Sequence, residues 1–373
     1  MAAPFVMRPT RRRLLAVIML LLSGPVAVAG PGQYGSAGFE LALPGYVFEF
    51  PRDHGAHDAY QTEWWYYTGQ VKTANGRSLG FELTFFRVGV TPPSRPAETA
   101  WDLRDLALAH FAISDISRRE FRYHEKLSRA TPFTAAARQG SLEMFNEGWK
   151  AATRSDGSLQ LKARDGGDAI DFRLVSTKPP AIHGQDGIST KGPGLGNASH
   201  YYSLTRLVVD GTITARGTAE KCKGLAWMDH EFGSSPLRDG QGWDWFSLQM
   251  DNETELMIYI LRRPDGKPGP ASAGSLVLAD GNVIHLKRED IQITRLGTWT
   301  SPRSGGTYPM GWNVRIAPVS LTVNVQEKLK DQELITRAST QVTYWEGAVG
   351  GIGTFGGTPV RADGYVEMTG YAK

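Results

Sequence analysis

Hydrophobic and aromatic residues alternate with polar ones in short runs along most of the chain, and turn residues separate the runs. Segment 62–71 has this alternation, 74–76 (Ala-Asn-Gly) follows as a turn signal, and 79–88 returns as a second run. Because a period of two puts successive side chains on opposite faces of a strand, each run predicts a half-buried strand. The other predicted strands of this first set are 107–113, 159–163, 170–175, 201–209, 212–220 and 225–229.

A second set of predicted strands begins near Trp243 and shares a short pattern with the first. An acid-Trp-aromatic run, a turn and a strand ending in arginine occur at 63–65 with Arg87 and again at 244–246 with Arg262. The match is short enough to arise by chance, and it also fits two similar antiparallel β-barrels in tandem. Short, regularly spaced strands predict an all-β fold of sandwiches or up-and-down barrels. The second set comprises 243–250, 255–262, 275–278, 283–286, 313–316, 320–325, 341–349 and 364–372.

Composition supports the all-β prediction. The 373 residues include 43 Gly, 21 Pro, 10 Trp, 13 Tyr and 15 Phe, so turn formers and aromatic side chains are abundant while helical periodicity is weak. With 21% charged residues and a mean hydropathy of −0.30, the chain has the composition of a folded protein. This excludes a disordered chain and a membrane protein with many spans.

The first 29 residues have the pattern of a secretory signal peptide. Arginines at 11–13 precede a nine-residue apolar run at 14–22, and Ala27-Val28-Ala29 provides a small-x-small cleavage site. The apolar run is much shorter than the roughly 20 residues of a membrane span. We therefore expect a periplasmic or secreted protein without a transmembrane anchor, and the paired arginines also resemble a twin-arginine signal.

Removal of residues 1–29 changes the charge balance. The segment holds four of the 41 basic residues and no acid, so 37 basic and 38 acidic residues remain, and no electrostatic case for nucleic acid is left. Cys222 is the only cysteine, so an intramolecular disulfide is excluded. A structural thiol is favoured for Cys222 over a nucleophile, because its strand-like segment lacks a catalytic context.

Arg87 is the first candidate for a functional side chain. Strand parity puts it on the face of Phe81, Leu83 and Phe85, inside a barrel if that face is interior. A buried guanidinium requires a carboxylate or a ligand oxygen, and Glu63 on the preceding strand is a suitable partner. Arg87 is therefore a candidate for substrate binding or for a structural ion pair.

The segment 227–233 (Trp-Met-Asp-His-Glu-Phe-Gly) is the densest polar group in the sequence. Trp227 and Asp229 share one strand face, and His230 lies on the other. Asp229 beside aromatic side chains is a candidate general acid, and His230 a candidate proton carrier. The alternative is that the acids cap a turn and His230 is exposed.

Asp244 is the second candidate acid, because parity puts it among apolar neighbours, where an acid is either paired or partly protonated. Trp243 and Trp245 flank it. Glu346 and Glu367 lie in similar aromatic strands and are expected to be ion-pair or hydrogen-bond partners.

The sequence gives little support for a metal or a cofactor. His54 and His57 are close in sequence, but the histidines match no zinc signature. No nucleophile elbow and no phosphate-binding loop are present, and the glycine pattern at 351–356 lacks a strand-to-helix context. We expect no metal and no cofactor.

Five segments together resemble the AttH and carotenoid 1,2-hydratase family, whose members are often catalogued as predicted secreted hydrolases. The similarity covers nearly all of the chain after the signal. It implies two tandem lipocalin-like antiparallel β-barrels (45–235 and 236–373), a hydrophobic pocket at or between them, and relatives that act on apolar polyenes without a cofactor. The five segments are 63–69, 80–87, 109–112, 227–233 and 243–246.

One departure affects the expected reaction. The carotenoid hydratase branch has a histidine directly before the aspartate that matches Asp229, and this chain has Met228 there. The chain therefore resembles the AttH branch more closely than the carotenoid hydratases.

Two functions follow as expectations. The first is a cofactor-independent hydratase or hydrolase acting on a hydrophobic, isoprenoid or lipid-like substrate. In it Asp229 or Asp244 would protonate an alkene or activate water, and aromatic rings would face the developing cation. The second is a non-catalytic periplasmic lipid-binding protein or chaperone, with an ABC-type exporter as partner. The rings of the first hypothesis are those of Trp64, Trp227, Trp243 and Trp245.

Overall fold

A computed structural model describes residues 35, 37–95, 98–99, 102–185, 187–234 and 242–372. This part of the chain is nearly all β, with 61% strand and 3% helix, as the alternating pattern predicts. The predicted signal peptide at 1–29 and the predicted boundary between 235 and 236 lie outside the described residues. No helix in the described part is long and apolar enough to cross a membrane.

The first sheet contains the strands up to residue 233, hydrogen-bonded in the order β4-β3-β2-β1-β13-β12-β9-β8-β7-β6-β5, with β10 and β11 paired to β12. Its strands are β1 (Thr62–Thr73), β2 (Ser78–Gly89), β3 (Asp105–Asp115), β4 (Glu120–Arg129), β5 (Ala135–Ala137), β6 (Glu143–Asn146), β7 (Trp149–Thr153), β8 (Leu159–Asp165), β9 (Asp168–Ser176), β10 (Ala181–Ile182), β11 (Ile188–Thr190), β12 (Ala198–Ala215) and β13 (Thr218–Gly233).

The second sheet follows in the order β17-β16-β15-β14-β23-β22-β20-β19-β18, with β21 paired to β22. Its strands are β14 (Gly242–Met250), β15 (Glu255–Arg262), β16 (Ala273–Val277), β17 (Val283–Leu286), β18 (Ile291–Thr300), β19 (Thr307–Ile316), β20 (Leu321–Glu327), β21 (Glu333–Ile335), β22 (Thr343–Phe355) and β23 (Thr358–Thr369). Short 3₁₀ turns occur at Arg52–His54, Arg288–Asp290 and Ala317–Val319.

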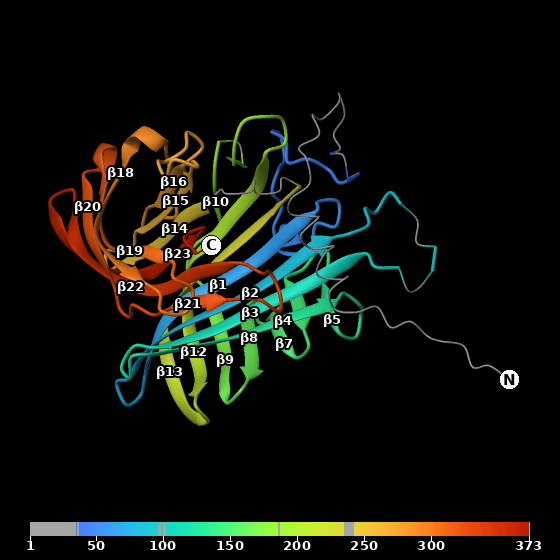
Figure 1. Cartoon of the computed structure of the whole chain (residues 1–373), viewed down its shortest axis with the longest axis horizontal. Helices are drawn as coiled ribbons and strands as arrows, with labels where there is room; N and C mark the ends of the chain where they lie inside the picture. Colours follow the sequence, from blue (N-terminus) through green and yellow to red (C-terminus); the bar gives the residue numbers. More distant parts are fainter. Residues whose placement is uncertain are drawn as a thin grey trace.

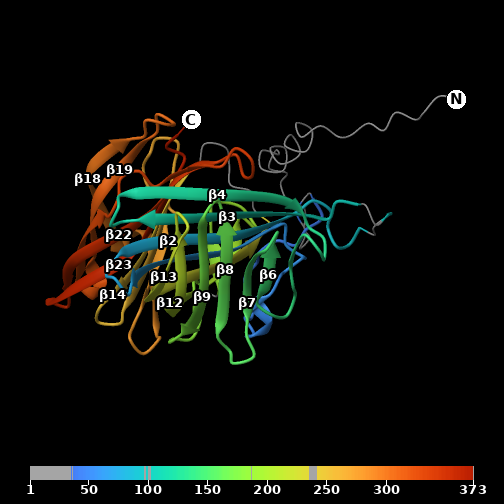
Figure 2. The same ribbon diagram turned by 90° about the horizontal axis from the view of Figure 1, so that it is seen from below.

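The two sheets share one topological plan. In each, the first four strands form a meander, and the first strand also pairs with the last, β1 with β13 and β14 with β23. One sheet closes into a nearly complete barrel and the other into a half-barrel. Figure 1 shows the second sheet, in orange and red, beside β1, β12 and β13 of the first, and Figure 2 shows both from below. The plan agrees with the sequence repeat at the two arginine-terminated hairpins.

Strand parity determines what each face buries. Trp65, Tyr67 and Val71 of β1 point into the first sheet, where they pack with Phe81 and Leu83 of β2 in a large apolar core. An equivalent core fills the second sheet. Fully burying one such side chain contributes roughly 1.5–3 kcal/mol, so these two interiors supply most of the hydrophobic stabilisation.

The opposite faces of the central strands are buried as well, because the two sheets pack against each other. Tyr66 and Trp227 of the first sheet contact Trp245, Tyr259 and Tyr365 of the second in a third aromatic cluster. We call this region the intersheet layer. It also contains polar side chains, and it holds most of the candidate residues discussed below.

Candidate active site between the two sheets

Asp229 lies at the centre of the intersheet layer. The indole Nε1–H of Trp227, two residues earlier on β13, donates to its Oδ1 at 2.6 Å, and the Ser203 hydroxyl of β12 donates to the same oxygen. Asp229 is only 4% exposed, and burial raises the pKa of its carboxyl to about 7, although both hydrogen bonds lower it. A large fraction of Asp229 is therefore neutral acid near pH 7, and Oδ2 is the oxygen left to carry its proton.

Three further carboxyl groups lie in the same layer. The Tyr66 hydroxyl donates to Oε1 of Glu346 at 2.7 Å, and the Tyr344 hydroxyl donates to Oε1 of Glu82 at 3.2 Å. Burial raises the pKa of Glu82 to about 7 and that of Glu367 to about 8. Burial and the neighbouring carboxylates raise the pKa of Glu346 well above its ordinary value. Since like charges repel, the group holds protons at neutral pH.

Aromatic rings surround these acids. The rings of Trp227 and Trp245 lie 6.1 Å apart at 79°, and Trp245 Nε1–H donates to the Tyr201 hydroxyl at 3.1 Å. Trp64 and Trp243 pack against the same cluster but are only partly buried. The side of the layer that these two residues border is therefore partly accessible to solvent.

Several buried oxygens in the layer have no hydrogen-bond partner: the hydroxyls of Thr68 and Tyr365, Oε2 of Glu82 and Oε2 of Glu346. A cavity of about 220 Å³ is lined by Thr68 and Tyr365 of this set, together with Trp227 and others. Unpaired buried oxygens are costly, and in folded proteins they usually bind water or a ligand group. The layer therefore has unused acceptors beside a space of the size of several waters or a small substrate group.

This arrangement supports acid–base chemistry on an apolar molecule. A neutral carboxyl provides a proton donor, unpaired oxygens of the neighbouring carboxyl groups can hold a water, and aromatic faces attract a positive charge. Ser203, Tyr201, Tyr66 and Glu82 were not predicted as site residues from the sequence. The alternation along the predicted strands could have indicated them, since each shares a strand face with another residue of the layer.

His230 and Arg87 lie elsewhere, on the interior side of the first sheet. His230 Nε2 is 2.9 Å from Oε1 of Glu63, and Arg87 Nε–H donates to Oε2 of the same carboxylate at 3.0 Å. Burial lowers the pKa of His230. Both side chains lie on the opposite strand face from Asp229. Two of the predicted site residues therefore belong to a different polar network. In this network Glu63 is the partner of Arg87, as the sequence predicted.

The same network contains the group of described residues with metal-like spacing. One ligand atom each from His57, Glu63 and His230 lies within 4.8 Å of the others. However, the His57 ring lies 2.8 Å from Glu63, and Arg87 occupies the other carboxylate oxygen. A cation there would face a guanidinium and displace existing hydrogen bonds, so the donor set fits a hydrogen-bonded ion network better than a metal centre.

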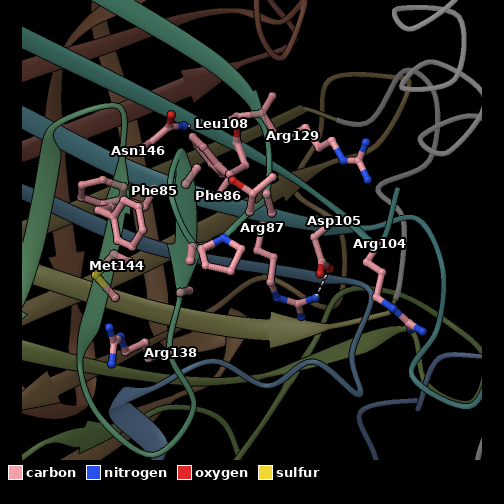
Figure 3. A pocket seen from close by; sticks show the side chains of 18 of the residues that line it. Phe85, Phe86, Arg87, Arg104, Asp105, Leu108, Arg129, Arg138, Met144 and Asn146 are labelled. Atoms are coloured by element: carbon pink, nitrogen blue, oxygen red, sulfur yellow. Dashed lines mark hydrogen bonds and ion pairs between the residues drawn. The ribbon is translucent and has the colours of Figure 1, made fainter. Parts of the chain in front are cut away.

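A larger cavity of about 650 Å³ opens beside Arg87 (Figure 3). Arg87 points to Asp105, with Nη1 donating at 3.0 Å, and charged residues including Arg104 and Arg138 stand at its rim. An apolar floor and a charged rim are the features of a site for an amphipathic molecule. The apolar lining comes from Trp65, Phe85, Phe86, Leu108, Met144 and Phe145.

Asp244 occupies an ion pair in the second sheet. Nη1 of Arg262 donates to its Oδ1, Nη2 of Arg295 lies 3.1 Å from Oδ2, and the Tyr371 hydroxyl donates to it. Burial raises the pKa of Asp244, and Arg262 and Arg295 oppose the rise. Strand parity predicted that Asp244 would be either paired or partly protonated, and the structure shows it paired with Arg262 and Arg295. Asp244 does not share the layer with Asp229, although its neighbours Trp243 and Trp245 do.

Comparison with known proteins agrees with this architecture. The model of the AttH-like family matches residues 41–371. The chain belongs to the AttH-like family. A crystal structure of a candidate AttH from Nitrosomonas europaea is 31% identical, with a TM-score of 0.81, and the alignment covers 90% of this chain and 100% of that chain. A search of curated proteins found no match.

Two more distant structures resemble this AttH-like protein in fold. Kievitone hydratase from Nectria haematococca has 16% identity and a TM-score of 0.66, covering 91% of this chain and 95% of its own. A structure of CghA with Sch210972 has 13% identity and a TM-score of 0.55, covering 92% and 98%. At these identities the similarity establishes the shared fold, and a hydratase is among the proteins that have it.

Proposed function

We propose that this AttH-like protein is a hydratase-like enzyme that works in the intersheet layer. It adds water to a carbon–carbon double bond of an apolar substrate, or removes water in the reverse direction. The observation that carries the proposal is the buried Asp229 beside Trp227, whose raised pKa keeps a large fraction of it protonated near pH 7, with further carboxyl groups in the same layer. The hydratase among the structural relatives supports the reaction class.

The proposed reaction uses groups of this chain only. Asp229 Oδ2 gives its proton to one alkene carbon, and the other carbon becomes a cation that the rings of Trp227 and Trp245 stabilise. A water attacks that carbon and passes its proton to a second water, and the unpaired Oε2 of Glu346 can hold such a water by a hydrogen bond. The sum is one hydrogen and one hydroxyl added across the double bond.

The substrate class follows from the surroundings. The layer offers aromatic surface and few fixed cations, so it suits an uncharged, unsaturated molecule such as an isoprenoid. Trp64 and Trp243, which are partly exposed, would contact the portion of the substrate that reaches solvent. The signal-like segment 1–29 further supports action in the periplasm or outside the cell.

The test is turnover of a panel of isoprenoids, polyenes and esters, with product analysis in H₂¹⁸O. We expect ¹⁸O to enter the product and the Asp229→Asn variant to lose about 10²–10⁴-fold in rate. Asp244→Asn is the matched control, because it alters a buried acid outside the layer. Turnover that is unchanged in Asp229→Asn, or lost in Asp244→Asn while the fold is intact, would contradict the assignment of the acid.

A second function is favoured by the cavity of about 650 Å³ beside Arg87. We propose there the binding of an amphipathic lipid, in a carrier or chaperone that serves an exporter. Native mass spectrometry of the protein purified from its host should show a co-purifying lipid, and Ala107→Phe, which fills the cavity, should release it. Retention of the lipid in that variant would place it elsewhere, and an empty protein would remove the support for this function.

A further inference from the structure

A line of side chains connects Asp229 with the second sheet. Ser203 donates to Asp229, and its Oγ also lies 2.6 Å from Nε2 of His183. The other ring nitrogen of His183, Nδ1, lies 3.0 Å from Oγ of Ser275 on β16. Ser275 is paired directly with His285 on β17. The line thus starts in the first sheet, crosses the layer and ends on the second sheet.

Exposure along this line changes from buried to exposed. Ser203, His183 and Ser275 are each 0% exposed, and His285 is exposed. Residues directly opposite in an antiparallel pair share a face and lie within side-chain reach, so His285 adjoins Ser275. A positive charge on His285 lowers the pKa of His183. His285 is therefore the member of the line that meets water.

The protons of the line fit one arrangement. Because Ser203 gives its only proton to Asp229, its oxygen accepts Nε2–H of His183, and Nδ1 then accepts the hydroxyl proton of Ser275. The charged groups that face His183 are Lys191 and His285. Burial, followed by these two, lowers the pKa of His183 to about 3, so the ring is neutral and passes a proton only by receiving one at the same time.

We propose that this line is the path by which Asp229 regains a proton from solvent after it has protonated the substrate. The proposal rests on the proposed function in that Asp229 is the acid. Ser203 gives its proton to Asp229, His183 gives Nε2–H to Ser203, Ser275 gives its proton to Nδ1 of His183, and His285 or a water beside it replaces the proton of Ser275. Each member loses one proton and gains one. A flip of the His183 ring then restores the starting tautomer, and a half-turn of the Asp229 carboxyl brings the new proton from the Oδ1 position, which Ser203 contacts, to the Oδ2 position.

The competing explanation is that His183 has only a structural role, in which its two hydrogen bonds hold the two sheets together. His183→Gln separates the two explanations, because an amide keeps one donor and one acceptor but does not take up a proton at one end and release one at the other. A matched control is His110→Gln. His110 is equally buried between two side chains, with 2.7 Å to the Tyr344 hydroxyl and 2.9 Å to Oγ of Ser339, but it lies off the line.

The experiment follows the infrared C=O stretch of protonated Asp229 in the full chain, identified as the band that Asp229→Asn removes. The protein is mixed rapidly into D₂O at about pH 5, where Asp229 is neutral, and the shift from COOH to COOD gives the rate of proton exchange. We expect exchange to slow about tenfold or more in His183→Gln and in Ser275→Ala, and to stay at the wild-type rate in His110→Gln.

The outcomes separate the path from the chemistry. Equal exchange rates in the wild type, His183→Gln and Ser275→Ala, with equal thermal midpoints, would overturn the path and leave Asp229 as the acid. Absence of an Asp229 band would show a carboxylate at that pH and overturn the proposed function itself. If His183→Gln fails to fold, Ser275→Ala decides the question, because it removes only one hydroxyl at the outer end of the line.

Discussion

The indole nitrogen of Trp227 and Oδ1 of Asp229 lie 2.6 Å apart, two residues from each other on one strand. The N–H of Trp227 stabilises the ionised carboxylate and so limits the rise in pKa that burial causes. Trp227→Phe keeps an aromatic ring but removes this donor. The pKa of Asp229 should then rise further above about 7, and the alkaline limb of the pH–rate profile should move to higher pH.

The control for this change is Trp245→Phe, because the indole of Trp245 donates to Tyr201 instead. It removes the same N–H from the same layer and should leave the titration of Asp229 in place. Infrared titration of the carboxyl measures both variants. An equal shift in the two variants would mean that general loss of polarity, not the Trp227 bond, sets the pKa.

Asp229 also links stability to pH. Its pKa is raised in the folded state from an ordinary 3.8 to about 7, so the folded protein holds a proton that the unfolded chain has lost in this window. Stability should therefore fall as pH rises from about 4 to 7, by up to about 4 kcal/mol from this group. Asp229→Asn should remove that slope in urea unfolding measured across pH, and a variant with the wild-type slope would assign the effect to other carboxyls.

Gly80 tests the packing of the two sheets. A Cβ at this position would lie 2.3 Å from the Tyr365 hydroxyl and 3.1 Å from Cβ of Ala348, across the intersheet layer. Gly80→Ala should therefore cost about 1–3 kcal/mol of unfolding free energy through overpacking. Tyr365→Phe should cost little, because this buried hydroxyl has no partner. The double variant should recover most of the loss in urea unfolding, and strictly additive losses would refute the clash.

Glu63 should be the most important carboxylate for stability in the first sheet. Burial raises its pKa, but the bonds to His230, His57 and Arg87 more than reverse this, so its pKa is well below the ordinary value. The resulting stabilisation is present at neutral pH and is lost as pH falls below about 4.5. Glu63→Gln leaves Arg87 without its main counter-charge and should cost about 3–5 kcal/mol in chemical unfolding.

A surface pair provides the comparison for Glu63. Lys162 and Asp171 lie 3.2 Å apart, and both side chains are 52% exposed. Asp171→Asn should cost less than about 1 kcal/mol. If Glu63→Gln were as mild as Asp171→Asn, the network around Arg87 would have to rearrange, and the variant should then also change the cavity beside it.

Cys222 should be inert in the folded protein. It is 3% exposed, and burial raises the pKa of its thiol to about 12. Since only the thiolate reacts, a disulfide-exchange reagent at about pH 8 should label Cys222 only after unfolding in urea. Rapid labelling of the native protein would show that this part of β13 opens locally.

Much of the fold could be predicted from the sequence because alternation directly reports strands. The predicted segments 62–71 and 79–88 lie inside β1 and β2, and parity correctly separates His230 from Asp229. Strands β4 to β7, β10, β11, β21 and the exposed edge strand β18 were not predicted. They are short, only partly buried or mostly solvent-facing, so they have little apolar alternation to detect.

Only part of the candidate site could be predicted from the sequence, for a different reason. Alternation shows which residues share a face of a strand, but not that a second sheet covers the outer face. β1 carries a signal of such cover, since Trp64 and Tyr66 are aromatic on one face while Trp65 and Tyr67 are aromatic on the other. Asp244 and Trp245 are likewise neighbours in sequence on opposite faces, so the aspartate and the indole belong to different sites.

The pairing of β1 with β13 has a consequence for biosynthesis. β1 begins at Thr62, and its partner strand ends at Gly233, so about three-fifths of the polypeptide must leave the ribosome before the second edge of β1 is fully covered. Until then the nascent chain presents an aromatic strand with one open edge, a template for pairing with other chains. The first sheet therefore cannot close until long after β1 has been synthesised. A holdase that shields nascent residues 62–89 should raise the yield of folded protein.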